Sequence, residues 1–355
     1  MSRLANLLWG ATFAALSVAC TGSAVSEAPT PEASASAAKG VVNLYSHRHY
    51  ESDKQLYATF QARTGIQVRV VKAGADQLIE RLASEGASSP ADLLVTADAG
   101  RLVRADAKGL LQPVQSEILT AAIPENLRHP GGHWFGLTQR ARVIVYDKER
   151  TQPSDLSTYA ALTEPTWKGK VLVRSSANMY NQSLLASIVA HEGEAGARRW
   201  AEGIVANMAR SPKGSDRDQM KALIAGVGDV AIVNTYYVGL LMNSKVPEER
   251  EVGERVGVFF PDQDGRGAHV NISGAGVTAH APNRDNAIQL LEFLVSDEAQ
   301  RVFSRANHEY PIKAGIALAE PLSTWGAFRA DDLPLSELGA HQATAVKVFD
   351  EAGWR

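Results

Sequence analysis

The stretch WFGLTQRARVIVYD, residues 134–147, is a long run that predicts extended structure, and it lies between two halves of the chain. A second extended run, HVNISGAGVTA, covers residues 269–279. Two strand-like crossings between two lobes form a hinge, and the cleft between hinged lobes is a natural ligand site. The two runs therefore favour two lobes around a cleft over a single large sheet.

Strands alternate with helices on both sides of residues 134–147. This alternation predicts an α/β fold with a mainly parallel sheet. We expect the first helix to be capped by Ser52 or Asp53, and the last long helical pattern to break near Ser296. The expected strands cover residues 41–46, 66–71, 91–97, 170–176, 227–234 and 256–261, and the expected helices cover residues 52–65, 75–86, about 182–192 and 284–305.

Length and charge set broad limits on the protein. A chain of 355 residues predicts two domains once a leader is removed. We expect an N-lobe of residues 41–141 plus 268–317 and a C-lobe of residues 142–267 plus 318–355. The formal net charge of −3, without a long basic block, argues against a nucleic-acid or anionic-membrane footprint. The single cysteine, Cys20, excludes disulfides within the chain and thiolate metal sites.

The first twenty residues predict an export signal. Arg3 is followed by an apolar segment, Leu4 to Ala19, that is a little short for a transmembrane helix. The sequence SVAC resembles a bacterial lipobox, although Ser17 stands where leucine is usual. Either Cys20 becomes the acylated N-terminus, or ordinary signal peptidase cleaves nearby. Residues 21–40 are rich in Ser, Ala, Pro and Glu and predict a disordered linker.

Three tyrosine-bearing segments follow predicted strands: YSHRHY (45–50), RSSANMYNQS (174–183) and NTYYVG (234–239). Ligands of open α/β sheets bind at the carboxyl ends of the strands. We therefore expect side chains from both lobes to converge on one cleft. These are His47, His49, Tyr50, Tyr180, Tyr236 and Tyr237.

Several phenol groups around one cleft indicate a hard, highly charged cation. Phenolate oxygen is a hard anionic donor, and a bound trivalent ion can displace the phenol proton at neutral pH. Ferric iron is the abundant ion with these properties. Four phenolates would leave the site at −1, which Arg140 could offset, whereas we expect Arg142 on the opposite face of the strand. In the other interpretation, the tyrosine pair is one core and one surface ring, Tyr180 lies in a loop, and the histidines are exposed.

Motifs along the chain carry a family resemblance. They are NLYSHRHYESDKQLYATFQARTGIQV, SEGASSPADLL, WFGLTQRARVIVYD, PTWKGKV, RSSANMYNQSL, GDVAIVNTYYVG, VGVFFPDQDGRGAHVNISGAGV and EYPI. With these motifs in family order, the chain from Val41 to Trp354 resembles the periplasmic, transferrin-like ferric-ion-binding proteins of bacterial ABC iron uptake. It is most similar to their cyanobacterial-type branch. The resemblance implies the two-lobed fold of type II periplasmic solute-binding proteins.

The resemblance also implies an iron ligand set. Tyr236 and Tyr237 match the paired tyrosines of the family, and Tyr50 and Tyr180 match two further ligands of the cyanobacterial-type branch. His49 matches a histidine that coordinates iron in several members, and Arg140 matches an arginine near the iron. One departure is Ala97, which stands where another branch has a glutamate ligand. Its neighbour Asp98 is an alternative ligand.

The function implied by the resemblance is capture of Fe³⁺ in the cleft and delivery to an inner-membrane ABC permease. The protein is then expected in the periplasm, as a monomer, with a lipid anchor at Cys20. A cleft for an oxyanion, a polyamine or another small solute is the alternative, since the two-lobed pattern accommodates it equally. An enzyme is not expected, because HExxH, GxSxG and P-loop motifs are absent and His191-Glu192 lacks a second histidine.

Overall fold

A computed structural model describes residues 40–48 and 50–355 of the chain. The predicted export signal with Cys20, residues 21–39 of the predicted linker and His49 lie outside the described residues, whereas Gly40, the last residue of that linker, is the first residue of a strand. All of the described residues belong to one compact unit. Among the described helices, none combines the length and the apolar character that a membrane crossing requires.

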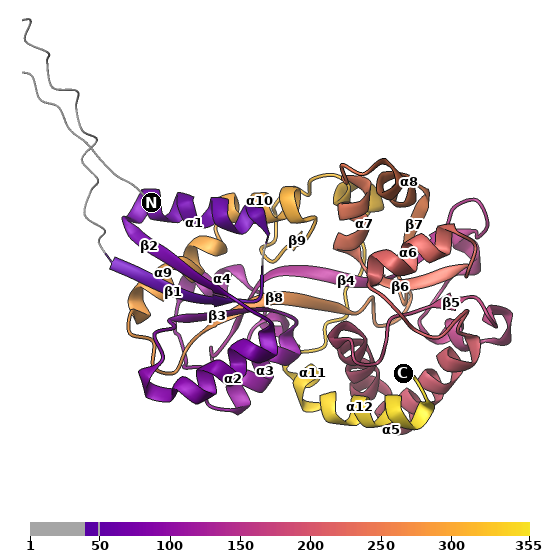
Figure 1. Cartoon of the computed structure of the whole chain (residues 1–355), viewed down its shortest axis with the longest axis horizontal. Helices are drawn as coiled ribbons and strands as arrows, with labels where there is room; N and C mark the ends of the chain where they lie inside the picture. The colour runs from indigo at the N-terminus through magenta and orange to yellow at the C-terminus, as the bar shows by residue number, and fades with distance from the viewer. Residues whose placement is uncertain (1–39, 49) are drawn as a thin grey trace, which may run out of the picture. The chain divides into compact units, whose positions relative to one another are not determined.

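The strand β4 (Phe135–Asp147) is shared by two parts of the sheet. Its first half pairs with β8 (Val270–Val277), and its second half pairs with β6 (Val230–Asn234) and β7 (Val256–Phe259). The strand order is β2-β1-β3-β8-β4-β6-β5, with β7 and β9 also paired to β4. In Figure 1, β4 and β8 run across the middle, between the helices α1 and α9 on one side and α6 to α8 on the other. The two extended runs are therefore the strands that connect the two lobes.

The expectation of a mainly parallel sheet is wrong. Parallel pairing joins β1 to β2, β1 to β3 and β5 to β6, whereas β8 is antiparallel to β3 and to β4. β4 is also antiparallel to β6, β7 and β9. The reason lies in the connections, because a strand that carries the chain from one lobe to the other enters each sheet against the direction of its neighbours. The remaining strands are β1 (Gly40–Ser46), β2 (Ile66–Lys72), β3 (Leu93–Ala97), β5 (Val171–Leu172) and β9 (Tyr310–Pro311).

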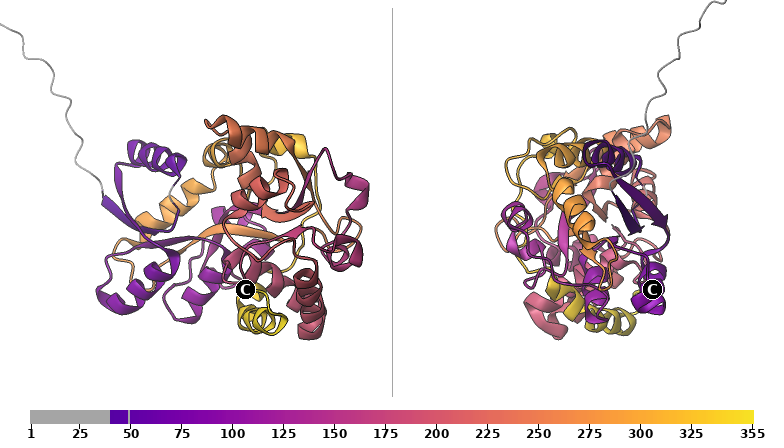
Figure 2. Two further views of the ribbon diagram at one scale, coloured as in Figure 1. Left: turned by 45° about the vertical axis from the view of Figure 1, so that its right-hand side comes forward. Right: turned by 90° about the vertical axis from the view of Figure 1, so that its left-hand side faces the viewer.

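The helices cover both faces of the sheet (Figure 2). α1 packs on β2 and α9 on β1, while α2 and α3 pack on β3. In the other lobe, α6 and α7 pack on β6 and β4. The helices are α1 (Glu51–Thr64), α2 (Ala75–Glu85), α3 (Ala99–Ala107), α4 (Glu117–Ala122), α5 (Met179–Asn207), α6 (Asp216–Ile224), α7 (Thr235–Met242), α8 (Pro247–Arg255), α9 (Arg284–Leu294), α10 (Asp297–Asn307), α11 (Ser336–Ala340) and α12 (Gln342–Ala352).

Of the two helix ends predicted from capping residues, the structure confirms one and contradicts the other. The break near Ser296 is confirmed, because the Ser296 side chain accepts a hydrogen bond from the Ala299 amide and caps α10. The cap at Ser52 or Asp53 is wrong, because Tyr50 holds the N-cap position and α1 begins at Glu51. Asp53 is buried in the first turn and binds Arg48 instead.

The segment after β5 also differs from the expectation. β5 ends at Leu172 rather than near residue 176, and α5 begins earlier than residue 182. The cause is Asn178, whose side chain accepts a hydrogen bond from the Tyr180 amide and so starts the helix. Tyr180 therefore lies in the first turn of α5.

The shared strand should be sensitive to loss of packing. Val143 of β4 is fully buried, whereas Val246 is 49% exposed. We expect Val143→Ala to lower the free energy of unfolding by about 2 kcal/mol, because it removes buried methyl groups and leaves a cavity. The matched control Val246→Ala should change it by less than about 0.5 kcal/mol. Urea unfolding measures both variants, and equal effects would contradict the assignment of β4 to the core.

Candidate metal centre

Four tyrosines lie at the N-terminal ends of three helices and line one cavity. Tyr50 is the N-cap of α1, Tyr180 lies in the first turn of α5, and Tyr236 and Tyr237 lie in the first turn of α7. The cavity has a volume of about 230 Å³ and is also lined by His47, Arg48, Ala97, Arg217 and Leu240. The structure thus brings together the tyrosines that the sequence places at three strand ends.

Three of the four phenol groups are joined by contacts through Tyr236. The Tyr236 hydroxyl donates a hydrogen bond to the Tyr180 hydroxyl at 3.2 Å, and the ring centres of Tyr236 and Tyr237 are 4.2 Å apart. Tyr236 is buried, with 2% of its surface exposed, and Tyr237 is half-buried. Both members of the pair face the same cavity, so the interpretation of one core ring and one surface ring does not describe them.

Burial makes the phenols hold their protons in the absence of a cation. Burial raises the pKa of Tyr236 well above its ordinary value, and the neighbouring Tyr180, Tyr50 and Tyr237 raise it further. Burial also raises the pKa of Tyr50, and it raises the pKa of Tyr237 to about 12. At neutral pH these phenols are therefore protonated, and any metal that binds them as phenolates must displace protons.

Helix geometry favours negative charge at the same place. The first turn of a helix carries unpaired amide N–H groups and a partial positive charge, which stabilises anions. The four phenols lie at three such ends, contributed by α1, α5 and α7. The site thus disfavours free phenolates by burial but is built to stabilise them once a cation is present.

Two buried arginines lie beside the tyrosine rings and share one carboxylate. The guanidinium carbon of Arg48 is 4.8 Å from the Tyr50 ring centre, and that of Arg140 is 5.6 Å from the Tyr236 ring centre. Glu309 lies between them and accepts hydrogen bonds from Arg48 Nη1 at 3.0 Å and Arg140 Nη2 at 2.8 Å. Within the described residues, Arg140 Nε and Nη1 have no hydrogen-bond partner. That guanidinium retains the capacity to stabilise nearby phenolate.

The expectation for Arg142 is wrong. Arg142 lines the same small void as Arg140 and Tyr180, and its guanidinium carbon is 6.0 Å from the Tyr180 ring centre. The reason is the pleat of the strand, which places residues two apart on the same face. Arg142 is held by Asp216, Asn234 and Asn181, with donor–acceptor distances of 2.9, 3.3 and 2.8 Å.

Sequence reasoning missed several charged residues of the site. The guanidinium carbon of Arg174 is 5.8 Å from the Tyr180 ring centre. Arg48 and Arg174 lie inside the tyrosine-bearing segments 45–50 and 174–183, so their proximity to those tyrosines was a usable signal. Glu309 gave no such signal, because it is 261 residues from its partner Arg48 and the chain must fold to join them.

Asp98 does not line the cavity, although its neighbour Ala97 does. Its carboxylate accepts hydrogen bonds from Ser183 Oγ at 2.8 Å, from Asn271 Nδ2 at 2.9 Å and from the Gly100 amide. Asp98 therefore caps α3 and joins it to α5. The alternative role of Asp98 as a ligand has no support in this arrangement.

Comparisons with known proteins agree with one another. A family model described as bacterial extracellular solute-binding protein matches residues 88–330. The chain is 51% identical to iron uptake protein A1 of Synechocystis over 88% of its length and 87% of that protein. The structure of Trichodesmium IdiA (FutA) in complex with iron and citrate matches with a TM-score of 0.87 and 50% identity, covering 89% of this chain and 100% of that one. The ferric binding protein from Campylobacter jejuni matches with a TM-score of 0.84 and 42% identity, covering 88% and 100%. These structures confirm the two-lobed α/β fold expected from the sequence.

The shared carboxylate should be important for stability. Glu309 is fully buried, and although burial opposes its ionisation, Arg48 and Arg140 lower its pKa below the ordinary value. We expect Glu309→Gln to lower the free energy of unfolding by about 3–5 kcal/mol, because it leaves the buried Arg140 guanidinium without its carboxylate partner, while Arg48 keeps Asp53. The exposed Glu251→Gln is the control and should have little effect.

The contribution of Glu309 to the free energy of unfolding should decrease at acidic pH. A lowered pKa in the folded state means that ionised Glu309 stabilises the protein above its unfolded pKa of about 4.3. This stabilisation is lost as the pH falls through the folded value. Urea unfolding at pH 7 and at pH 3 should show less difference in Glu309→Gln than in the wild type, and an unchanged difference would contradict the assignment.

Proposed function

We propose that the chain binds Fe³⁺ in the tyrosine-lined cavity and delivers it to an ABC permease. The chain belongs to the family of bacterial extracellular solute-binding proteins, which are binding proteins and not enzymes. The observation that carries this proposal is the convergence of four tyrosines on one cavity. Relatives named for iron uptake and ferric binding support the same cargo.

The proposed ligands are the phenolates of Tyr50, Tyr180, Tyr236 and Tyr237. Ferric iron is a hard cation that prefers anionic oxygen donors, and four phenolates around it leave a net charge of −1. The buried guanidinium of Arg140 beside Tyr236 offsets that charge. His49 is a further candidate ligand by family resemblance, and His47 lines the described cavity.

Binding is proposed to couple to lobe closure. We assign residues 41–141 plus 268–317 to the N-lobe, which supplies Tyr50, and residues 142–267 plus 318–355 to the C-lobe, which supplies the other three tyrosines. Only a closed arrangement brings both sets to one ion, so the ion stabilises closure through its greater affinity for that state. Closed and open forms then differ on the surface that a permease would contact.

The proposed setting is the periplasm. The family is described as extracellular, which agrees with the export signal expected at the N-terminus. Acylation of Cys20 would hold the protein, as a monomer, beside the membrane that carries its permease. The chain's partner is then that permease, and its cargo is ferric iron.

Ferric binding should produce visible colour. Addition of Fe³⁺ as ferric citrate should give a phenolate-to-iron charge-transfer band in the wild type. Tyr236→Phe/Tyr237→Phe should lose most of the band and bind Fe³⁺ at least about a hundredfold more weakly, since even outer-shell changes weaken metal sites by roughly 10–100-fold. Tyr146→Phe, a core tyrosine on β4, is the matched control. A colourless wild type that binds iron no better than buffer would favour an oxyanion or organic solute instead.

Iron binding should release protons. The phenols of Tyr50, Tyr236 and Tyr237 have raised pKa values and are protonated in the free protein between pH 6 and pH 8. Each displaced proton makes the apparent affinity fall by about tenfold for each unit that the pH is lowered. A pH indicator in weak buffer measures the protons released per Fe³⁺, with the ferric chelate alone as the control. Release of less than one proton would contradict phenolate ligation.

A further inference from the structure

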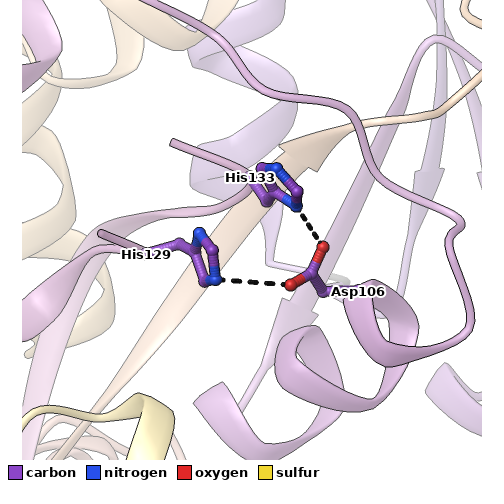
Figure 3. Close-up of side chains that lie close together, drawn as sticks. All are labelled: Asp106, His129 and His133. Atoms are coloured by element: carbon purple, nitrogen blue, oxygen red, sulfur yellow. Dashed lines mark hydrogen bonds and ion pairs between the residues drawn. The ribbon is translucent and has the colours of Figure 1, made fainter. Parts of the chain in front are cut away.

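A second cluster of metal-ligating side chains lies where α3 meets the segment that leads into β4. Asp106 is in the last turn of α3, and His129 and His133 flank the turn HPGGH. Figure 3 shows both imidazoles directed at the Asp106 carboxylate. His133 Nδ1 is hydrogen-bonded to one carboxylate oxygen, and His129 Nε2 is 3.4 Å from the other. Among the described residues, this is the one group of three or more His, Cys, Asp or Glu whose ligand atoms all lie within 4.8 Å of one another.

Backbone hydrogen bonds and one glycine fix the conformation of the turn that carries the two histidines. The His129 amide donates to the Trp134 carbonyl at 2.9 Å, and the Gly132 amide donates to the His129 carbonyl at 2.9 Å. Gly132 has φ 76, and a Cβ at its position would lie 2.4 Å from the Val114 carbonyl oxygen, so glycine is required there. The turn therefore presents both imidazoles on one side, with ring centres 4.7 Å apart.

We propose that Asp106, His129 and His133 form a second metal site, for a divalent cation of the Zn²⁺ class. Two imidazole nitrogens and one carboxylate oxygen form a donor set suited to Zn²⁺, Cu²⁺ or Ni²⁺, whereas Mg²⁺ and Ca²⁺ prefer oxygen ligands throughout. The three side chains are 19–30% exposed. An ion can therefore enter from solvent and keep a water as a fourth ligand, as in three-ligand zinc sites.

Three contacts must change when the metal binds. An ion at His129 Nε2 and His133 Nδ1 replaces the contact that each nitrogen makes with the Asp106 carboxylate, and the third change is at the backbone hydrogen bond to His129. The Gly131 amide donates to His129 Nδ1 at 3.0 Å, so the neutral ring carries its proton on Nε2, towards Asp106. A metal at Nε2 places the ring proton on Nδ1 instead, and the Gly131 amide must then turn to another acceptor. Gly131 is exposed, so water can accept that hydrogen bond.

The site is separate from the tyrosine cavity, since it shares no residue with the cavity lining. It joins the end of α3 to residue 133, two residues before the first residue of β4. A bound ion would therefore cross-link a helix of one lobe to the entry of the strand that both lobes share. The expected effect is a higher melting temperature in the presence of the ion, without iron.

Calorimetric titration of the metal-free chain with Zn²⁺ tests the proposal. We expect the wild type to bind one Zn²⁺ at this cluster, and His133→Asn and Asp106→Asn each to weaken that binding by at least about tenfold. His280→Asn removes an exposed imidazole elsewhere and should bind as the wild type does. Mg²⁺ should give no binding at the same concentration. Circular dichroism melting without metal establishes that each variant is folded.

The tyrosine variant separates this proposal from the proposed function. Tyr236→Phe/Tyr237→Phe should keep the Zn²⁺ site while losing ferric binding, and His133→Asn should do the reverse. Zn²⁺ binding that is absent from the wild type, unchanged in His133→Asn, or lost in the tyrosine variant would overturn the second site. In the first two cases, the cluster is a carboxylate paired with two histidines and nothing more.

Discussion

The candidate iron site depends on one buried arrangement of charge, in which the Glu309 carboxylate is held between Arg48 and Arg140. The three residues come from the segment just after β1, from β4 and from the segment before β9, so the arrangement exists only in the folded chain. Each guanidinium lies near the ring of a tyrosine that lines the cavity. Removal of charges from water is unfavourable unless they are paired. Glu309 therefore allows both guanidinium groups to lie buried beside phenols that burial would otherwise keep protonated.

The tyrosines themselves combine two opposed tendencies. Their burial favours the protonated phenol, while the helix N-termini and the arginines favour the phenolate. A pocket with only the first property would exclude a cation, and a pocket with only the second would hold repelling phenolates in the empty state. In the proposed function, this combination gives phenols that are neutral in the empty site and ionise only around a bound cation. That behaviour suits a protein that must acquire an ion and later release it.

The sequence was a good guide to elements and to the tyrosines, and a poor guide to strand direction and to distant partners. Apolar runs and glycine stops located most strands and helices, and strand ends located Tyr50, Tyr180, Tyr236 and Tyr237, because these signals are local. The antiparallel course of β8 between β3 and β4 was not predictable from local pattern. The same holds for Glu309, because its role depends on residues far away in the chain. The error for Arg142 had a different cause, since the strand pleat alone would have placed it beside Arg140.

The sharing of β4 has a mechanical consequence. A strand whose backbone groups bond β8 at one end and β6 and β7 at the other cannot leave one sheet without disturbing the other. Loss of order in either lobe would expose amides in its neighbour, so the lobes should behave as one cooperative unit rather than as two independent foldons. Bending between the lobes must then be distributed over small changes in backbone dihedral angles along the continuous strands. The connection is therefore elastic along its length and does not rotate about a single flexible residue.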